Sequence, residues 1–191
     1  MCQPRSEISE KNEWSNIVLI GLMGAGKTSI GRRLAIYLDI DFIDSDEEII
    51  KAAGHSIPDI FSIYGEPKFR EIEERVITRI LRQERKVLAT GGGAYMNPRI
   101  RNAIDLKGFS IWLKASHEVL MERTFRQKNR PLLKAGNPKQ ILHDLIHERY
   151  PIYSTADLTI ETGKENITET LNKIVDALPS KLLPSNRDNP T

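Results

Sequence analysis

The first residues able to do chemistry form a glycine-rich stretch near the N-terminus, Gly21-Leu22-Met23-Gly24-Ala25-Gly26-Lys27-Thr28, with Ser29 next. This spacing is typical of a P-loop, a backbone cradle for phosphate groups. The glycines allow a positive φ and a close approach to phosphate, and the unpaired amides that open the next helix attract the anion. Lys27 adds a charge for the β- and γ-phosphates, and the Thr28 hydroxyl offers a ligand to Mg²⁺. The stretch predicts binding of a nucleoside triphosphate through residues 24–29.

Two carboxylates follow the next apolar segment, in Asp44-Ser45-Asp46. If the extended backbone continues through them, both point to one side, one toward a metal ion and one deeper into a cleft. The carboxylate near the metal would stay ionised, whereas its neighbour could accept a proton from an attacking hydroxyl. The alternative is that Asp46 only caps the helix that follows it.

Two arginines are candidates for binding an acidic substrate. Arg70 lies one step from the apolar stripe of the longest expected helix, where its two-pronged guanidinium could grip a carboxylate. The alternative is an exposed ion pair with Glu73 or Glu74, three and four residues further on. Arg149 has a comparable alternative, because the helix dipole favours a cation at a helix C-terminus without any ligand. Spacing alone leaves both interpretations open.

Three consecutive glycines and a basic segment complete the candidate set. Gly91-Gly92-Gly93 would let a ligand lie against the backbone, or would serve only as a flexible connection. A basic cluster lies in or beside the polar segment 126–136, and its members are Arg123, Arg126, Lys128 and Arg130. Such a segment could close on a nucleotide and deliver an arginine to the phosphoryl group, and the alternative is a solvated run of charge.

Alternating strands and helices must position these residues. Apolar runs predict strands at 17–20, 40–43, 86–90, 109–113 and 158–160. Periodicity and capping residues predict helices from 27 onward and at 47–53, 58–64, 66–82, 97–104, 116–124, 138–149 and 165–178, with Pro151 closing the one before it. The alternation indicates a parallel sheet covered on both faces, with the P-loop, the aspartates and the glycines at the carboxyl ends of strands.

The whole chain fits one α/β domain with a small lid, at 191 residues, 39% hydrophobic and 28% charged. A net charge of +2 gives no reason to expect nucleic acid or a membrane surface, and no apolar run is long enough to span one. The single cysteine, Cys2, fits a reducing compartment, so a cytoplasmic location is expected. We expect a flexible arm at 1–15, the domain at 16–178 and a disordered tail at 179–191.

As a set, the motifs resemble those of the shikimate kinase family, and the resemblance covers most of the expected domain. It is carried, in order, by the P-loop, Asp44-Ser45-Asp46, Phe69-Arg70-Glu71-Ile72-Glu73, Gly91-Gly92-Gly93-Ala94, Arg130-Pro131-Leu132-Leu133 and Arg149-Tyr150-Pro151-Ile152-Tyr153. The fold that it implies is the three-layer α/β/α fold of P-loop kinases, similar to nucleoside monophosphate kinases. That fold has a five-stranded parallel sheet, a substrate-binding subdomain after the second strand, and a lid, here at about 124–137.

The activity that the resemblance implies is ATP-dependent phosphorylation of shikimate at its 3-hydroxyl by a monomer, with Mg²⁺ as cofactor. For the nucleotide, it implies that Lys27 and the P-loop amides bind ATP and that Thr28 and Asp44 support the metal. It also implies that Arg123 lies against the adenine, and that Arg130 reaches the phosphates from the lid.

For the acceptor, the resemblance implies that Asp46 binds the shikimate hydroxyls and acts as the base. Arg70 and Arg149 would clamp the carboxylate, with Gly91, Gly92 and Gly93 alongside the ring. The catalytic residues would then be Asp46, Lys27 and Arg130. Such a set suits phosphoryl transfer, which depends mainly on positioning and on neutralising charge.

The chain departs from the family pattern at two places. The strand at 86–90 runs into Thr90-Gly91-Gly92 instead of an acidic residue, which leaves support of the metal to Asp44. The arginine that relatives often carry near the adenine is absent from Gly163-Lys164-Glu165, so Lys164 receives no role.

Two other functions remain as alternatives. One is a sibling small-molecule kinase such as gluconate kinase, whose acceptor also carries a carboxylate; the paired aspartates together with both arginine motifs argue against it. The other is a non-catalytic nucleotide switch, and the chain has no N-K-x-D motif for reading guanine.

Overall fold

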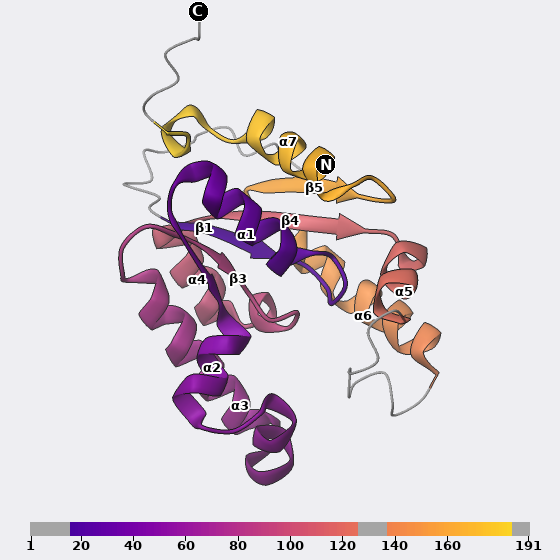
Figure 1. Ribbon diagram of the computed structural model, residues 1–191. Coiled ribbons are helices and arrows are strands. Elements are labelled where there is room, and N and C mark those ends of the chain that lie inside the picture. Colours follow the sequence, from indigo (N-terminus) through magenta and orange to yellow (C-terminus); the bar gives the residue numbers. More distant parts are fainter. Residues whose placement is uncertain (1–15, 126–136, 185–191) are drawn as a thin grey trace, which may run out of the picture.

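The computed structural model describes residues 16–125 and 137–184 (Figure 1). Its elements are β1 (Asn16–Ile20), α1 (Lys27–Leu38), β2 (Asp41–Asp44), α2 (Ser45–Ala53), α3 (Ile57–Leu81), β3 (Lys86–Ala89), η1 (Ala94–Met96), α4 (Pro98–Lys107), β4 (Gly108–Ala115), α5 (His117–Phe125), α6 (Pro138–Tyr153), β5 (Leu158–Thr162), α7 (Ile167–Ala177) and η3 (Ser180–Leu182). The expected alternation of strands and helices is confirmed. The arm at 1–15, most of the lid with Arg130, and residues 185–191 lie outside the described residues.

The five strands form one parallel sheet in the order β2-β3-β1-β4-β5. Strand β1 therefore lies in the middle, with β3 on one side and β4 on the other. The connection after β1 leads to β2 at one edge of the sheet, whereas the connection after β3 leads to β4 on the other side of β1. The two connections run in opposite directions, and the crevice at such a switch point is where open α/β sheets bind ligands. The P-loop begins directly after β1, so the sheet places it at that crevice.

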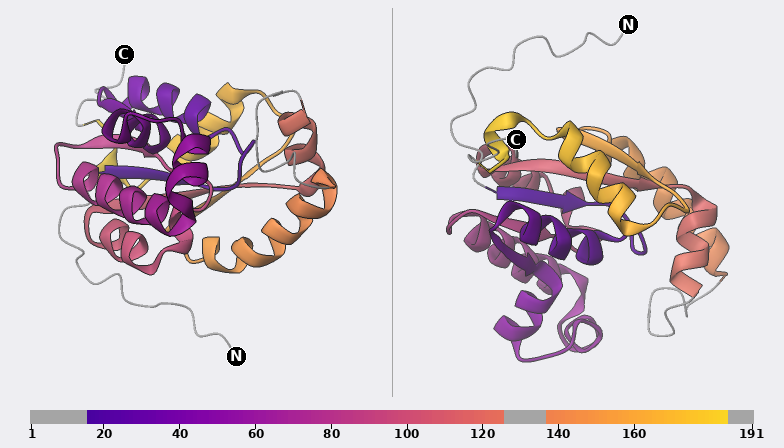
Figure 2. Two further views of the ribbon diagram at one scale, coloured as in Figure 1. Left: turned by 90° about the horizontal axis from the view of Figure 1, so that it is seen from below. Right: turned by 45° about the horizontal axis from the view of Figure 1, so that its top comes forward.

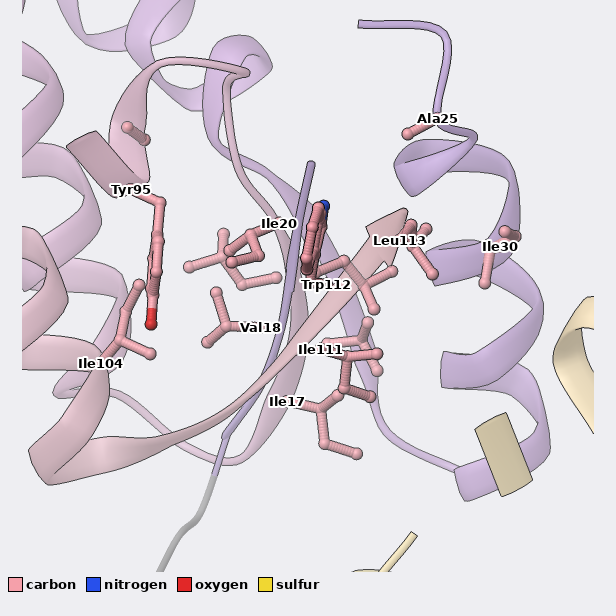
Figure 3. Close-up of a cluster of buried hydrophobic side chains, with 14 of the residues drawn as sticks. Ile17, Val18, Ile20, Ala25, Ile30, Tyr95, Ile104, Ile111, Trp112 and Leu113 are labelled. Carbon is pink, nitrogen blue, oxygen red and sulfur yellow. The ribbon is translucent and has the colours of Figure 1, made fainter. Parts of the chain in front are cut away.

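Helices cover both faces of the sheet (Figures 1 and 2). Helix α1 packs against β2, β3 and α7 on one face, while α4 packs against β4 and α3 on the other. Strand β1 is buried along its whole length, as expected for a parallel strand covered on both sides. In Figure 3, Ile17 and Leu113 point toward α1, whereas Val18 and Tyr95 lie on the opposite side of the sheet. The expected three-layer α/β/α architecture is confirmed.

Helices α2 and α3 pack against each other and extend away from the sheet beyond β2 (Figure 1). Gly65, with φ 76° and ψ 169°, breaks α3 into two helical segments, close to the expected boundary between 58–64 and 66–82. Ser56 caps the first segment by accepting a hydrogen bond from the Asp59 amide at 3.3 Å. The second segment returns to the sheet and carries Arg70 toward the crevice.

Helix α6 continues past its expected end at Arg149, through Pro151 to Tyr153. Pro151 lacks the amide that would bond to the carbonyl of His147, but His147 is exposed and its carbonyl can bond to water. Hydrogen bonding resumes beyond the proline, where the Ser154 amide donates to the Tyr150 carbonyl at 2.9 Å. The additional turn brings Tyr153 against the sheet.

The ordered domain also extends beyond residue 178. Leu182, in η3, is 1% exposed, and its carbonyl accepts a hydrogen bond from the Arg85 guanidinium. Leu183 packs against the same core. The expectation of a disordered tail is therefore wrong for residues 179–184, because their apolar side chains find a place in the core. Among the described helices, none is long and apolar enough to cross a membrane.

Candidate active site

The P-loop joins β1 to α1 through three glycines with positive φ: Gly21 at 141°, Gly24 at 81° and Gly26 at 98°. These angles suit glycine and explain why the segment is rich in it. The Lys27 ammonium donates to the carbonyls of Gly21 at 2.8 Å and Leu22 at 3.0 Å. The charge of Lys27 therefore lies over the loop whose amides open helix α1, which is the arrangement expected of a phosphate cradle.

Thr28 and Asp44 meet at the start of α1. The Thr28 hydroxyl donates to Asp44 Oδ2 at 2.8 Å, and Asp44 Oδ1 accepts from the Asp46 amide at 3.0 Å. Asp44, and not Asp46, is thus the N-cap of α2. Because β2 ends at Asp44, Asp46 belongs to the first turn of α2, and the two carboxylates are not aligned by strand alternation as expected. The Thr28 hydroxyl and the Asp44 carboxylate both offer oxygen atoms, which suit a hard divalent cation such as Mg²⁺.

Gly91-Gly92-Gly93, here called the glycine loop, lies against functional side chains from three helices. The Gly91 amide donates to the Ser45 hydroxyl at 3.0 Å. A Cβ placed on Gly91 would lie 2.7 Å from Asp46 Oδ1, and one on Gly93 would lie 2.8 Å from both Nη1 and Nη2 of Arg70. Side chains at these positions would fill the space beside Asp46 and Arg70, so glycine is required there for the close approach.

Arg70 is held between two carboxylates of its own helix. Its Nη1 donates to Glu73 Oε2 at 2.7 Å, and its Nη2 to Glu66 Oε1 at 3.0 Å. Burial lowers the pKa of Arg70, but the two carboxylates outweigh it and the net shift is upward. Glu66 is largely exposed, as an ion pair on a helix surface would be, whereas Glu73 is 1% exposed.

Glu73 is therefore a buried carboxylate in the site and not part of the exposed ion pair that its spacing suggested. Burial raises its pKa, the nearby negative Asp46 raises it further, and the Arg70 and Arg149 cations act in the opposite direction. A second arginine thus acts electrostatically on the same group as Arg70.

Arg149 reaches the glycine loop from α6. Its Nη1 donates to the Gly92 carbonyl at 2.9 Å, and the Tyr153 hydroxyl donates to the same oxygen. The Nε of Arg149 is buried and finds no hydrogen-bond acceptor among the described residues. A buried donor without an acceptor is costly, so this edge of the guanidinium suits an oxygen of a bound ligand.

Arg123, at the C-terminal end of α5, joins the P-loop to the segment after β5. Its Nη1 donates to the carbonyls of Gly24 and Ala25, both at 3.4 Å, and its Nη2 to the Gly163 carbonyl at 2.5 Å. The guanidinium of Arg123 is thus engaged with backbone oxygens on both sides, and its contact with the adenine stays a prediction.

A cavity of about 940 Å³ lies along the P-loop and reaches the two aspartates and Gly92. Its lining includes Lys27, Thr28, Asp44, Asp46, Gly92, Arg123 and Lys164 together with most of the P-loop. Arg70, Arg149, Gly91 and Gly93 are not part of that lining, but they are joined to it through the contacts of the glycine loop. The structure therefore brings together every predicted site residue that it describes, and it also places Lys164, which received no role, at the cavity wall.

Three side chains in this region were not predicted from the sequence as part of the site: Ser45, Glu73 and Tyr153. Ser45 lay between the two aspartates, Glu73 was interpreted as a surface charge, and Tyr153 was quoted only as part of a motif. Their contacts join residues that lie far apart in the chain, and no local pattern reports such contacts. Within the described part of the chain, no cluster of three or more His, Cys, Asp or Glu side chains could hold a metal ion.

A P-loop at the switch point of this parallel sheet, with Asp44, Asp46 and Arg123 at the same cavity, is typical of a P-loop kinase. The family model described as "Shikimate kinase" matches residues 23–179. The chain belongs to the shikimate kinase family.

Relatives named shikimate kinase resemble the chain over most of its length. The protein of Rhizobium leguminosarum bv. trifolii is 52% identical over 166 residues, which are 85% of this chain and 85% of the relative. That of Mesorhizobium japonicum is 47% identical over 163 residues, 85% of this chain and 80% of the relative.

Solved structures agree with this assignment. A shikimate kinase from Acinetobacter baumannii, in complex with shikimate, superposes with a TM-score of 0.81 at 42% identity, covering 85% of this chain and 91% of that one. A gluconokinase from Sinorhizobium meliloti gives a TM-score of 0.56 at 17% identity, covering 86% of this chain and 92% of that one, which shows a shared fold only.

Proposed function

We propose that the protein transfers the γ-phosphoryl group of ATP to the 3-hydroxyl of shikimate, giving ADP and shikimate 3-phosphate. The observation that carries this proposal is the convergence of Arg70 and Arg149 on the glycine loop beside Asp46. Two arginines suit an acceptor with a carboxylate, and a carboxylate at the cavity wall such as Asp46 suits one with hydroxyl groups. Membership of the shikimate kinase family supports the same acceptor.

On the donor side, Lys27 and the amides of residues 24–29 bind the phosphates. The Lys27 ammonium now donates to two backbone carbonyls, and phosphate oxygens would replace these as stronger, charged acceptors. Arg123 borders the base, and Arg130, which lies outside the described residues, would reach the phosphoryl group from the lid. These cations neutralise charge that spreads over the phosphoryl oxygens during transfer.

A divalent cation is expected of an ATP-using kinase, and we propose Mg²⁺ held by Thr28 and, more indirectly, Asp44. Their oxygens are 2.8 Å apart, and Mg²⁺ prefers oxygen ligands. When bound, the ion would add positive charge beside the phosphates. Asp44 also caps α2, so the same carboxylate keeps Asp46 in place.

On the acceptor side, Arg70 and Arg149 hold the carboxylate of shikimate from two helices. Arg149 offers its buried Nε, for which no protein acceptor is found among the described residues. The glycine loop leaves room for the ring, because Cβ atoms at Gly91 and Gly93 would occupy the space beside Asp46 and Arg70. With the substrate fixed in this way, Asp46 accepts the proton of the attacking hydroxyl.

One chain supplies every described group in this scheme, and we propose that the protein acts as a monomer. We also propose a cytoplasmic location, where ATP is available. Sedimentation at working concentration tests the monomeric state, since a dimer would have twice the mass of the monomer.

The activity itself is tested by ADP release from ATP and Mg²⁺ with shikimate, gluconate or AMP in parallel. Of the three acceptors, we expect only shikimate to be turned over, and we expect this turnover to be lost when the metal is chelated. Lys27→Met is the control that should abolish turnover with any acceptor. Turnover with gluconate or AMP instead would keep the kinase fold and reject shikimate, and no turnover with any acceptor would support a nucleotide switch.

A further inference from the structure

The carbonyl of Gly92 accepts hydrogen bonds from two side chains of α6. One donor is Nη1 of Arg149, at 2.9 Å, and the other is the hydroxyl of Tyr153. The two residues are four apart, one turn of the helix, and therefore lie on one face. This carbonyl is thus the point at which α6 is joined to the glycine loop.

Tyr153 is held firmly in this position. It is 1% exposed, and its ring packs edge-on against Tyr95 and Trp112, with centroids 6.2 Å and 6.0 Å away. Burial raises the pKa of Tyr153 to about 12, although the Arg149 cation acts in the opposite direction. The hydroxyl is therefore protonated at any working pH and remains a donor.

The shared Gly92 carbonyl determines the orientation of the Arg149 guanidinium. The Tyr153 hydroxyl fixes the Gly92 carbonyl, and that carbonyl holds Nη1 of Arg149, so the buried Nε of the guanidinium is turned in a defined direction. Tyr153 itself is not part of the cavity lining. We infer that Tyr153 is a positioning residue, which orients Arg149 for the carboxylate of the acceptor; this rests on the proposed function.

Helix α6 contains a matched control, Tyr150. It also packs edge-on against Trp112, with ring centroids 4.8 Å apart, and burial raises its pKa to about 12 as well. Its hydroxyl, however, donates to the Ala115 carbonyl at the end of β4 and not to the glycine loop. Removing either hydroxyl deletes one tyrosine–carbonyl hydrogen bond, and only one of these bonds involves Gly92.

The test compares steady-state kinetics of Tyr153→Phe and Tyr150→Phe with those of the wild type. Loss of one hydrogen bond behind Arg149 should raise KM for shikimate about threefold to tenfold in Tyr153→Phe, with KM for ATP unchanged. Tyr150→Phe should keep the wild-type KM for both substrates. Melting temperatures should fall by similar amounts in the two variants, since each loses the same kind of bond.

Two further measurements separate positioning from a general loss of structure. In the Arg149→Ala background, Tyr153→Phe should raise KM for shikimate no further, because the hydroxyl acts through the missing guanidinium. With the methyl ester of shikimate, which lacks the carboxylate charge, wild type and Tyr153→Phe should differ much less than with shikimate.

Three results would overturn the positioning role: an unchanged KM for shikimate in Tyr153→Phe, an equal rise in Tyr150→Phe, or full additivity with Arg149→Ala. Each of them presupposes shikimate-dependent turnover by the wild type. Absence of that turnover would instead reject the proposed function, so the two failures are distinguishable.

Discussion

Asp46 has the most exacting role of any single residue in the proposed reaction. It lies on the first turn of α2, and a Cβ on Gly91 would come within 2.7 Å of its Oδ1. Asp46→Asn keeps the shape but cannot accept a proton, so kcat should fall about 10²- to 10⁴-fold while ATP still binds. ADP release and titration calorimetry with ATP measure the two quantities.

The control for this variant is Asp41→Asn, an exposed aspartate at the start of the same β2 strand. It should retain full turnover. Wild-type turnover in Asp46→Asn would rule out the base role for this carboxylate.

Glu73 gives a prediction about pH. Burial raises its pKa above the ordinary 4.5, so the folded protein keeps this proton over a pH range in which the unfolded chain has lost it. The free energy of unfolding therefore contains a contribution that falls as pH rises from about 4.5 through the raised pKa. The glutamine of Glu73→Gln does not titrate, so this variant does not lose that contribution. Its free energy of unfolding relative to wild type should therefore rise with pH from about 4.5 to the raised pKa of Glu73, as urea unfolding at several pH values would show.

Glu71, two residues earlier, provides a control of opposite sign. Hydrogen bonding to Lys68 and the charge of Arg75 lower its pKa, so its contribution to stability is present above the ordinary pKa and is lost as pH falls. The contribution is small because Glu71 is exposed to solvent. A difference between Glu73→Gln and wild type that stayed constant with pH would contradict the upward shift.

The sequence predicted individual residues well where the signal was local. The P-loop is one continuous motif, and Lys27 and Thr28 lie where it places them. Capping of α2 by Asp44 was missed because it depends on the residue at which β2 ends. The burial of Glu73 was missed because a charged side chain at helical spacing is normally exposed, and only the packing of α2 and the glycine loop around it shows otherwise.

Among the elements, the glycine loop offers a steric test. Gly93 has φ −102°, which any residue can adopt, so an alanine there is not strained by its backbone. Its Cβ would lie 2.8 Å from Nη1 and Nη2 of Arg70. Gly93→Ala should therefore displace Arg70 and raise KM for shikimate about tenfold or more, with KM for ATP unchanged, in the same ADP-release assay.

The double variant Gly93→Ala/Arg70→Ala tests the cause. If the alanine acts by displacing the guanidinium, KM for shikimate should match that of Arg70→Ala alone. A further rise in the double variant would show that the methyl group obstructs the substrate directly.

Elements were predicted in type and order, and their ends less well. Helix α6 was predicted to end at Arg149 because a proline follows at position 151, whereas the helix continues to Tyr153. The hydroxyls of Tyr150 and Tyr153 bond to distant carbonyls and stabilise this last turn. Those contacts join residues 35 and 61 positions apart, beyond any local pattern. The break in α3 was found because Gly65 marks it in the sequence.

For the whole molecule, the C-terminal boundary gives a prediction about stability. Leu182 is 1% exposed and belongs to the core, although it lies four residues past the expected end of the domain. Leu182→Ala should lower the free energy of unfolding by about 2–5 kcal/mol, the usual cost of deleting a buried leucine side chain. Denaturant unfolding measures the change, with Leu106→Ala, at a residue 70% exposed, as the control that should have little effect.

The layer architecture could be predicted from alternation alone, because parallel strands need helical crossovers that cover both faces. The order β2-β3-β1-β4-β5 came only from the structure, since no strand carries in its sequence a sign of which strands are its neighbours. The site was predicted as a set of residues and not as a set of contacts. Arg123 illustrates the difference, because its hydrogen bonds to the Gly24 and Gly163 carbonyls span 99 and 40 residues of chain.

The adjacency of β1 and β3 has a consequence for how new substrate preferences can arise. The P-loop follows one of these strands and the glycine loop the other, so donor and acceptor are spaced by the sheet, whose strands lie about 4.8 Å apart. The side chains proposed to bind the acceptor come from α2, α3 and α6, outside the sheet. Substitutions in these helices can therefore change which acceptor is bound, while the spacing between the P-loop and the glycine loop stays the same.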